Sequence, residues 1–195
     1  MNFQSDIRSR IEKFLVGVEK PARYVGGEVN SFRKDPGAQR VRVCLAFPDV
    51  YEIGQSYMGF HILYHILNKR PATLCERTFA PWPDMERVMR DEGLPLWSVE
   101  SFLPLSSFDV IGFTLQYELH YTAVLNMLDL SGIPLLASER DERHPLVFGG
   151  GASCANPEPV AEFFDAFLLG DGEEGFPEML DVIERCRLSG VPKRD

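Results

Sequence analysis

The sequence predicts an α/β protein whose parallel sheet is doubly wound, with helices covering both faces to give three layers. Apolar runs of strand length alternate with amphipathic stretches of helix length along most of the 195 residues, which is typical of repeated β-α-β units. Polar or glycine-containing clusters follow the apolar runs, as they do at the carboxyl ends of parallel strands. Because parallel strands are joined by right-handed crossovers, we expect five strands in the order 2-1-3-4-5.

The composition is that of an ordinary globular domain. Hydrophobic residues make up 45% of the chain, and 14 Phe, 6 Tyr and 2 Trp provide enough aromatic surface to argue against disorder. The net charge of −9 argues against a nucleic-acid partner, since binding phosphates needs a basic face. The sequence shows neither a signal peptide nor an apolar run of membrane-spanning length, so we expect a soluble, cytoplasmic protein with no membrane partner.

Residues 1–39 are expected to form an N-terminal helix and an extended connection outside the main domain. Residues 4–18 carry apolar side chains at helical spacing, among them Ile7, Ile11 and Phe14. A proline then breaks the helix, and a polar stretch that contains glycine follows it. We expect the helix to dock through these three apolar side chains on the domain formed by residues 40–195.

Strands and helices alternate within that domain. The strands are expected at residues 41–47, 74–79, 109–115, 146–148 and 165–169, with residues 94–99 as an added edge strand. The helices are expected at residues 54–68, 84–92, 119–131, 157–164 and 173–187. In the first of these helices, the side chains expected to face inward are Met58, Ile62, Leu63, Ile66 and Leu67.

The loops after the strands contain the candidate binding residues, because ligands of doubly wound sheets bind at the carboxyl ends of the strands. The triple glycine at residues 149–151 allows two interpretations. It is either a flexible turn or a surface without side chains, where a large flat or nucleotide-like ligand approaches the backbone. The chain contains neither the dinucleotide pattern G-x-G-x-x-G at its first strand nor a P-loop, so nicotinamide and P-loop sites lack their signatures.

Residues that could catalyse a reaction or bind a metal form no recognisable pattern. His61 and His65 lie four residues apart, but no H-E-x-x-H glutamate accompanies them, so we interpret them as packed or partly exposed helix residues. Glu173 and Glu174 begin a helix, where acidic groups complement the helix dipole, and a role in ligand contact is the alternative interpretation. The four cysteines are too widely spaced to hold an iron–sulfur cluster, and Cys44 is expected in the core. The sequence favours a binding domain without catalytic or metal-ligating residues.

The loop after the first strand resembles the corresponding loop of cobalamin-binding domains, whose pattern is Asp-x-His-x-x-Gly. Asp49 and Gly54 match this pattern, but Tyr51 stands where the family has the histidine that becomes the lower cobalt ligand. Thr114 resembles the serine of the family's Ser-x-Leu element. Residues 150–152 resemble the family's Gly-Gly element, which lies against the nucleotide tail of the cofactor.

This resemblance implies a Rossmann-like or flavodoxin-like fold of the cobalamin-binding type, with a cobalamin site at the strand ends. The cofactor-binding residues that it implies are Asp49, Tyr51, Gly54, Thr114, Gly149, Gly150, Gly151 and Gly172. A phenol must lose its proton before it can bind a metal, whereas a neutral imidazole binds directly. Tyr51 therefore implies cobalamin without a protein lower ligand, or a domain that has kept the fold and lost the cofactor. In the second case Tyr51 is a packing residue.

A closer resemblance extends over nearly the whole chain, to uncharacterised radical S-adenosylmethionine proteins with an N-terminal cobalamin-binding-like domain. It is carried by residues 19–28, 80–85, 112–119, 156–159 and 170–174. In full-length members the chain continues into a barrel with a C-x-x-x-C-x-x-C motif, and that motif is absent here. The resemblance implies an accessory domain whose partner is its own C-terminal barrel. It also implies that S-adenosylmethionine and a 4Fe-4S cluster bind only in that barrel.

The resemblance thus implies a domain that holds, or formerly held, cobalamin beside the barrel of an enzyme with an unknown substrate. This chain alone is expected to lack catalysis. Two alternatives remain open. One is a structural or docking module without a ligand, which predicts an exposed apolar patch facing the barrel. The other is a flavodoxin-like domain for flavin or a phosphorylated small molecule, although the Ser/Thr-rich first loop typical of flavin phosphate sites is missing.

Overall fold

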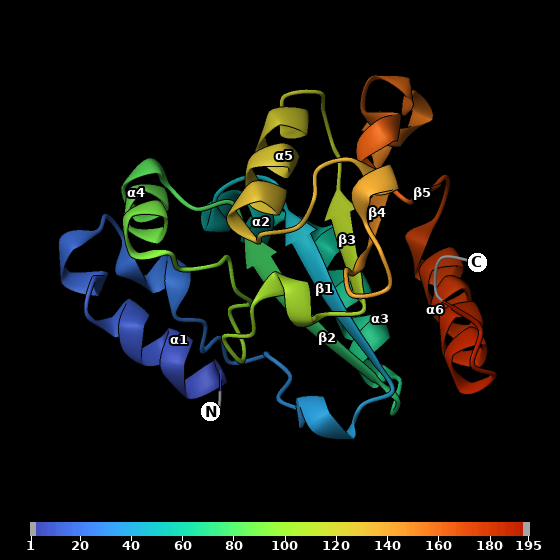
Figure 1. Cartoon of the computed structure of the whole chain (residues 1–195), viewed down its shortest axis with the longest axis horizontal. Coiled ribbons are helices and arrows are strands. Elements are labelled where there is room, and N and C mark those ends of the chain that lie inside the picture. Colours follow the sequence, from blue (N-terminus) through green and yellow to red (C-terminus); the bar gives the residue numbers. More distant parts are fainter. Residues whose placement is uncertain (1–2, 193–195) are drawn as a thin grey trace.

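The computed structural model describes residues 3–192, with side chains from Ile7 onward, and contains a parallel five-stranded sheet between two layers of helices (Figure 1). The strand order is β2-β1-β3-β4-β5, which confirms the expected order and the doubly wound α/β class. The strands are β1 (Val41–Phe47), β2 (Thr73–Phe79), β3 (Val110–Thr114), β4 (Leu146–Gly150) and β5 (Ala166–Leu168). No described helix is both long enough and apolar enough to cross a membrane.

The strands pair in register around β1, which lies between β2 and β3. Val43 of β1 pairs with Cys75 of β2 on one side and with Val110 of β3 on the other. Alternate residues of β1 belong to the cores on opposite faces of the sheet, so Val43 and Leu45 lie in one core and Cys44 in the other. Because both faces are covered, β1 and β3 are largely apolar runs, whereas the buried β2 also contains Glu76, Arg77 and two threonines.

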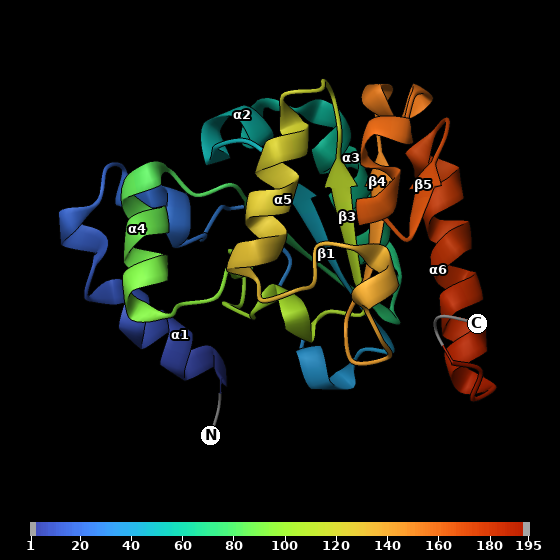
Figure 2. The same cartoon turned by 45° about the horizontal axis from the view of Figure 1, so that its top comes forward.

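Two helices cover each face of the sheet. Helices α3 (Met58–Lys69) and α6 (Gly172–Leu188) pack together on one face. Helices α4 (Pro83–Glu92) and α5 (His120–Leu130) contribute to the core on the other. Figure 2 shows α5 in front of the sheet and α3 behind it. This arrangement leaves the carboxyl ends of the strands at the edge where the connecting loops meet.

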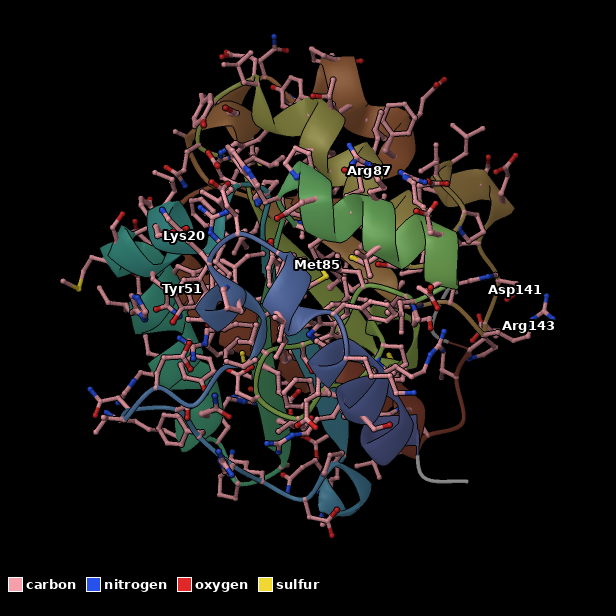
Figure 3. All side chains as sticks on the ribbon, turned by 90° about the vertical axis from the view of Figure 1, so that its left-hand side faces the viewer. Lys20, Tyr51, Met85, Arg87, Asp141 and Arg143 are labelled. Carbon is pink, nitrogen blue, oxygen red and sulfur yellow. The ribbon has the colours of Figure 1, made fainter. Side chains whose placement is uncertain are left out.

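The N-terminal helix docks on the α4 and α5 side of the sheet, as expected. Ile7 and Ile11 are buried in that core, and Phe14 packs against it. Helix α1 (Phe3–Glu12) is shorter than the expected 4–18, because the chain tightens into a 3-10 turn over Leu15–Gly17. Val16 and Gly17 in this turn are poor helix formers, which favours an early end of the α-helix. Figure 3 looks at this side of the molecule and shows the N-terminal segment lying across it.

The expected helix over residues 54–68 is interrupted. Tyr57 has an extended backbone, with ψ 108°, and separates α2 (Tyr51–Ser56) from α3. The interruption changes which side chains face the sheet. Phe60, Tyr64 and Leu67 are buried, whereas Met58, expected to face inward, is 70% exposed. Ile62 was also expected to face inward and is exposed.

Residues 94–99 do not form the expected edge strand. Their apolar side chains are buried, but Trp97 forms only an isolated bridge to Pro104, and Ser98 bonds with Leu103 of the same loop. The remaining backbone groups find single partners, from Leu96 N–H to the Leu130 carbonyl and from Val99 N–H to the Arg77 carbonyl of β2, so no continuous ladder forms. The expected helix over residues 157–164 is a 3-10 helix over Glu158–Phe163.

A buried cation joins three segments at β2. The side chain of Arg77 is 3% exposed, and its Nε donates to Glu100 Oε1 at 2.7 Å. Its Nη2 donates to Glu28 Oε2 at 3.2 Å, and the guanidinium lies 4.2 Å from the centre of the Tyr64 ring. Since Glu28 belongs to the N-terminal segment and Glu100 to the loop after α4, one guanidinium ties both to β2. Burial raises the pKa of Glu100 to about 7, against the lowering effect of Arg77.

The raised pKa of Glu100 predicts a stability that falls between about pH 4.5 and pH 7. In this window the unfolded chain ionises this carboxyl while the folded chain keeps it protonated, so the folded state loses its advantage as the pH rises. Glu100→Gln carries no titrating group. Relative to the wild type, the free energy of unfolding of this variant should therefore gain up to about 3 kcal/mol from pH 4.5 to pH 8. Denaturant unfolding across this range measures the difference.

The matched control is Glu158→Gln, which changes an exposed carboxyl elsewhere on the surface. Its stability should follow the wild type in parallel at every pH. A Glu100→Gln profile that also runs parallel to the wild type would contradict the raised pKa.

Candidate functional site

A cavity of about 190 Å³ opens at the carboxyl edge of the sheet, between the strands and the helices α3 and α6. Its walls combine apolar side chains with glycine backbone. The apolar side chains that form them are Leu45 and Phe148 from the strands, Phe60 and Leu63 from α3, and Phe176 and Met179 from α6. Such walls suit a flat apolar group of small size.

The glycines of the cavity have different roles. A Cβ on Gly149 would come within 2.8 Å of the Phe167 ring, so this glycine allows close packing. Gly151 has a φ of +112°, a backbone conformation that side chains disfavour. A Cβ on Gly150 would meet nothing nearer than the Leu168 carbonyl oxygen at 4.0 Å. The space beside Gly150 is therefore left free, and it belongs to the cavity.

The polar side chains that line the cavity are those of Tyr57 before α3, Thr114 at the end of β3, Asp171 immediately before α6, and Glu173 in the first turn of α6. Asp171 and Glu173 are exposed and mark its mouth. Among the described residues that line it, none is a lysine, arginine or histidine. The lining therefore presents two carboxylates and two hydroxyls.

The structure brings together five of the eight candidate residues. Thr114, Gly172 and the triple glycine 149–151 all line the cavity. Asp49, Tyr51 and Gly54 do not line it, although they follow the central strand β1. The strand-end loops therefore converge as expected, but the first loop turns its side chains elsewhere.

The phenol of Tyr51 is directed toward the N-terminal segment (Figure 3). Its hydroxyl donates to Glu28 Oε1 at 2.6 Å, and its ring packs edge-on against Phe79 with the centroids 5.1 Å apart. Burial and the adjacent Glu28 carboxylate raise the pKa of Tyr51. A phenol held protonated in this way is a poor metal ligand.

Asp49 and Gly54 have local structural roles in the same loop. Asp49 Oδ1 accepts the backbone N–H of Val50 at 2.7 Å, and its Oδ2 accepts the hydroxyl of Tyr117 at 2.9 Å. Gly54 is buried, and a Cβ there would lie 2.5 Å from the Phe79 ring. The match of these two residues to the cobalamin-loop pattern thus coincides with close packing of α2 on the sheet.

The histidines lie outside the cavity. His61 donates from Nε2 to the carbonyl oxygen of Gln55 at 2.7 Å, and His65 packs edge-on against Phe32. His120 is buried at the end of β3, where its Nδ1 accepts the backbone N–H of Gln116, and burial lowers its pKa. Within the described part of the chain, no group of three His, Cys, Asp or Glu side chains could hold a metal ion.

The sequence did not identify the apolar walls of the cavity or its acidic mouth. Leu63 was assigned to the inner face of its helix, and Phe176 reads as an ordinary core residue of an amphipathic helix. Asp171 and Glu173 belong to a strand-end cluster expected at the binding edge, where the sequence favoured a solvated helix start and left a ligand contact open. The signal that was available is the Gly-Asp-Gly-Glu cluster, which directly follows a strand.

The fold and the position of the cavity define a doubly wound α/β domain of the Rossmann or flavodoxin-like type. Residues 59–195, well over half of the chain, match the family described as radical SAM proteins, N-terminal, where SAM is S-adenosylmethionine, and the chain belongs to this family. An uncharacterised protein of Methanocaldococcus jannaschii is 28% identical over 145 residues, which cover 73% of this chain and 26% of that protein. The chain therefore spans about a quarter of the length of this relative.

The bond between Tyr51 and Glu28 predicts a stabilising role for this phenol. Tyr51→Phe removes a half-buried hydrogen bond to a carboxylate and leaves the ring contact with Phe79 intact. The free energy of unfolding should fall by about 1–2 kcal/mol, as measured by denaturant titration.

Tyr117→Phe is the matched comparison, since Tyr117 also donates to a carboxylate but is exposed. Its loss should be below about 1 kcal/mol, because water replaces the bond. Equal losses for the two variants would show that the Tyr51 bond has no special weight.

Proposed function

We propose that this chain is the N-terminal accessory domain of a radical SAM protein and holds cobalamin by the base of its nucleotide tail. The observation that carries the proposal is the apolar, glycine-lined cavity at the carboxyl edge. A dry cavity of about 150 Å³ takes up benzene, so a cavity of about 190 Å³ is of the right size for much of a two-ring base. The free space beside Gly150 would admit the tail close to the backbone.

The residues present fit the tail of the cofactor and offer no lower cobalt ligand. No histidine among the described residues lines the cavity, and Tyr51 is bonded to Glu28. Bound cobalamin would supply a cobalt centre able to carry carbon groups. This chain would hold the base between Phe176 and the strands and would leave the cobalt face without a protein ligand.

The partner in this proposal is a radical SAM domain that covers the cavity mouth. Three large apolar side chains on the segments that follow β1, β3 and β5 are exposed: Met58 by 70%, Leu119 by 79% and Leu169 by 67%. Met58 and Leu169 are each flanked by cavity-lining residues. Large exposed apolar side chains at the strand-end edge would suit an interaction surface. S-adenosylmethionine and the 4Fe-4S cluster would bind in the partner domain, together with a substrate of unknown class.

A second candidate function is a docking module that binds no small molecule. The same three exposed side chains favour it, because docking needs the apolar rim and does not need the cavity. The two functions differ in whether the cavity takes a ligand.

Titration with hydroxocobalamin separates the two functions. The purified chain should shift the cobalt absorption bands toward the base-off form, because the base is withdrawn into the cavity. In Gly150→Val, the side chain would occupy the free space beside the backbone that the ligand would otherwise occupy. Binding should weaken by at least about tenfold, while the circular dichroism spectrum stays unchanged.

Gly17→Val is the control, because a Cβ at Gly17 meets nothing within 4 Å and this glycine lies in the N-terminal 3-10 turn. It should bind hydroxocobalamin like the wild type. Bands that do not change at any concentration would refute cobalamin binding and favour the docking module. Equal binding by both valine variants would refute the cavity as the site.

A further inference from the structure

The charged side chains at the mouth of the cavity are all negative. Asp171 and Glu173 both line it, whereas no cationic side chain of the described residues does. The interior beyond them is apolar. A ligand that enters must therefore place an apolar end inside and bring a polar group up against two carboxylates.

Both carboxylates are free to accept hydrogen bonds. Asp171 occupies the N-cap position of α6, but its side chain makes no capping bond. Neither the Asp171 carboxylate nor that of Glu173 bonds to a described residue, and both residues are exposed. Asp171 would ordinarily satisfy the first N–H groups of the helix, so its side chain is available to a ligand.

The charge at the start of α6 also disfavours phosphate. A helix N-terminus attracts anions through its dipole and its free N–H groups. Here Glu173 and Glu174 already supply negative charge within the first turn. A phosphate monoester would add about −1.5 to −2 charges beside them, and like charges at this distance repel.

We propose that the cavity selects an aromatic ring joined to an unphosphorylated sugar, whose hydroxyls donate to Asp171 and Glu173. A carboxylate accepts two hydroxyl donors well, since it offers two oxygens and no proton. The inference deepens the proposed function and rests on the cavity being a ligand site. In cobalamin, the ring and ribose of the tail would occupy this site, with the singly charged phosphodiester outside the mouth. A flavin mononucleotide or another phosphomonoester should bind less tightly.

The test compares 5,6-dimethylbenzimidazole riboside with its 5′-phosphate by calorimetry on the purified chain. The riboside should bind about tenfold more tightly at low ionic strength, because only the phosphate meets the carboxylates. Raising the salt concentration should reduce the ratio, since exposed charges are screened. In the double variant Asp171→Asn, Glu173→Gln, the ratio should approach one.

Glu174→Gln is the matched control. Glu174 lies in the same first turn of α6 but does not line the cavity. This variant should keep most of the discrimination, whereas a loss equal to that of the double variant would assign the effect to helix charge in general. All three substitutions change exposed side chains, and unaltered circular dichroism spectra would establish that the variants fold.

The outcomes separate this inference from the proposed function. Riboside discrimination without hydroxocobalamin binding would support the acidic mouth and refute the cobalamin proposal. Hydroxocobalamin binding together with equal affinities for the riboside and its phosphate would support the cobalamin proposal and refute the selection by the acidic mouth. If the phosphate binds more tightly, or if neither compound binds, the inference is overturned.

Discussion

The buried guanidinium of Arg77 is the contact on which the arrangement around β2 depends. A cation removed from water is tolerated only when it is paired and hydrogen-bonded, and Arg77 obtains its partners from two distant segments, at Glu28 and Glu100. The N-terminal segment and the loop after α4 must therefore fold against β2 together. The same contact decides where Tyr51 points, because the carboxylate that accepts its phenol is the one held by Arg77.

Much of the fold could be predicted because both faces of the sheet are covered. A strand buried on both faces is usually apolar, and this left a clear pattern for β1 and β3, although the buried β2 also holds Glu76 and Arg77. The inner face of α3 could not be predicted, because Tyr57 interrupts the helix and changes the phase of every side chain after it. Residues 94–99 are apolar because they are buried, and their backbone makes single bonds to Leu103, Arg77 and Leu130 instead of a continuous strand ladder. The apolar pattern of the sequence does not distinguish such a buried loop from a strand.

The candidate site was predictable where topology alone decides it. Parallel strands end at one edge, so Thr114 and the triple glycine had to meet. The orientation of Tyr51 depends instead on Glu28, a partner 23 residues away in the sequence. The walls supplied by α3 and α6 also escaped prediction, because a side chain lining an apolar cavity has the same residue type and spacing as one that fills a core.

The central strand β1 lies outside the residues that match the family model. The family match begins at residue 59, after β1 has ended at Phe47. Yet β1 is the only strand that pairs with both β2 and β3 within the described sheet. A fragment that began at the start of the match would contain β2 and β3 without the strand that pairs with both. The cores on the two faces of the sheet would also lack the side chains that β1 contributes to them. The autonomous folding unit therefore reaches back at least to Val41, and the burial of Ile7 and Ile11 extends it into the first helix.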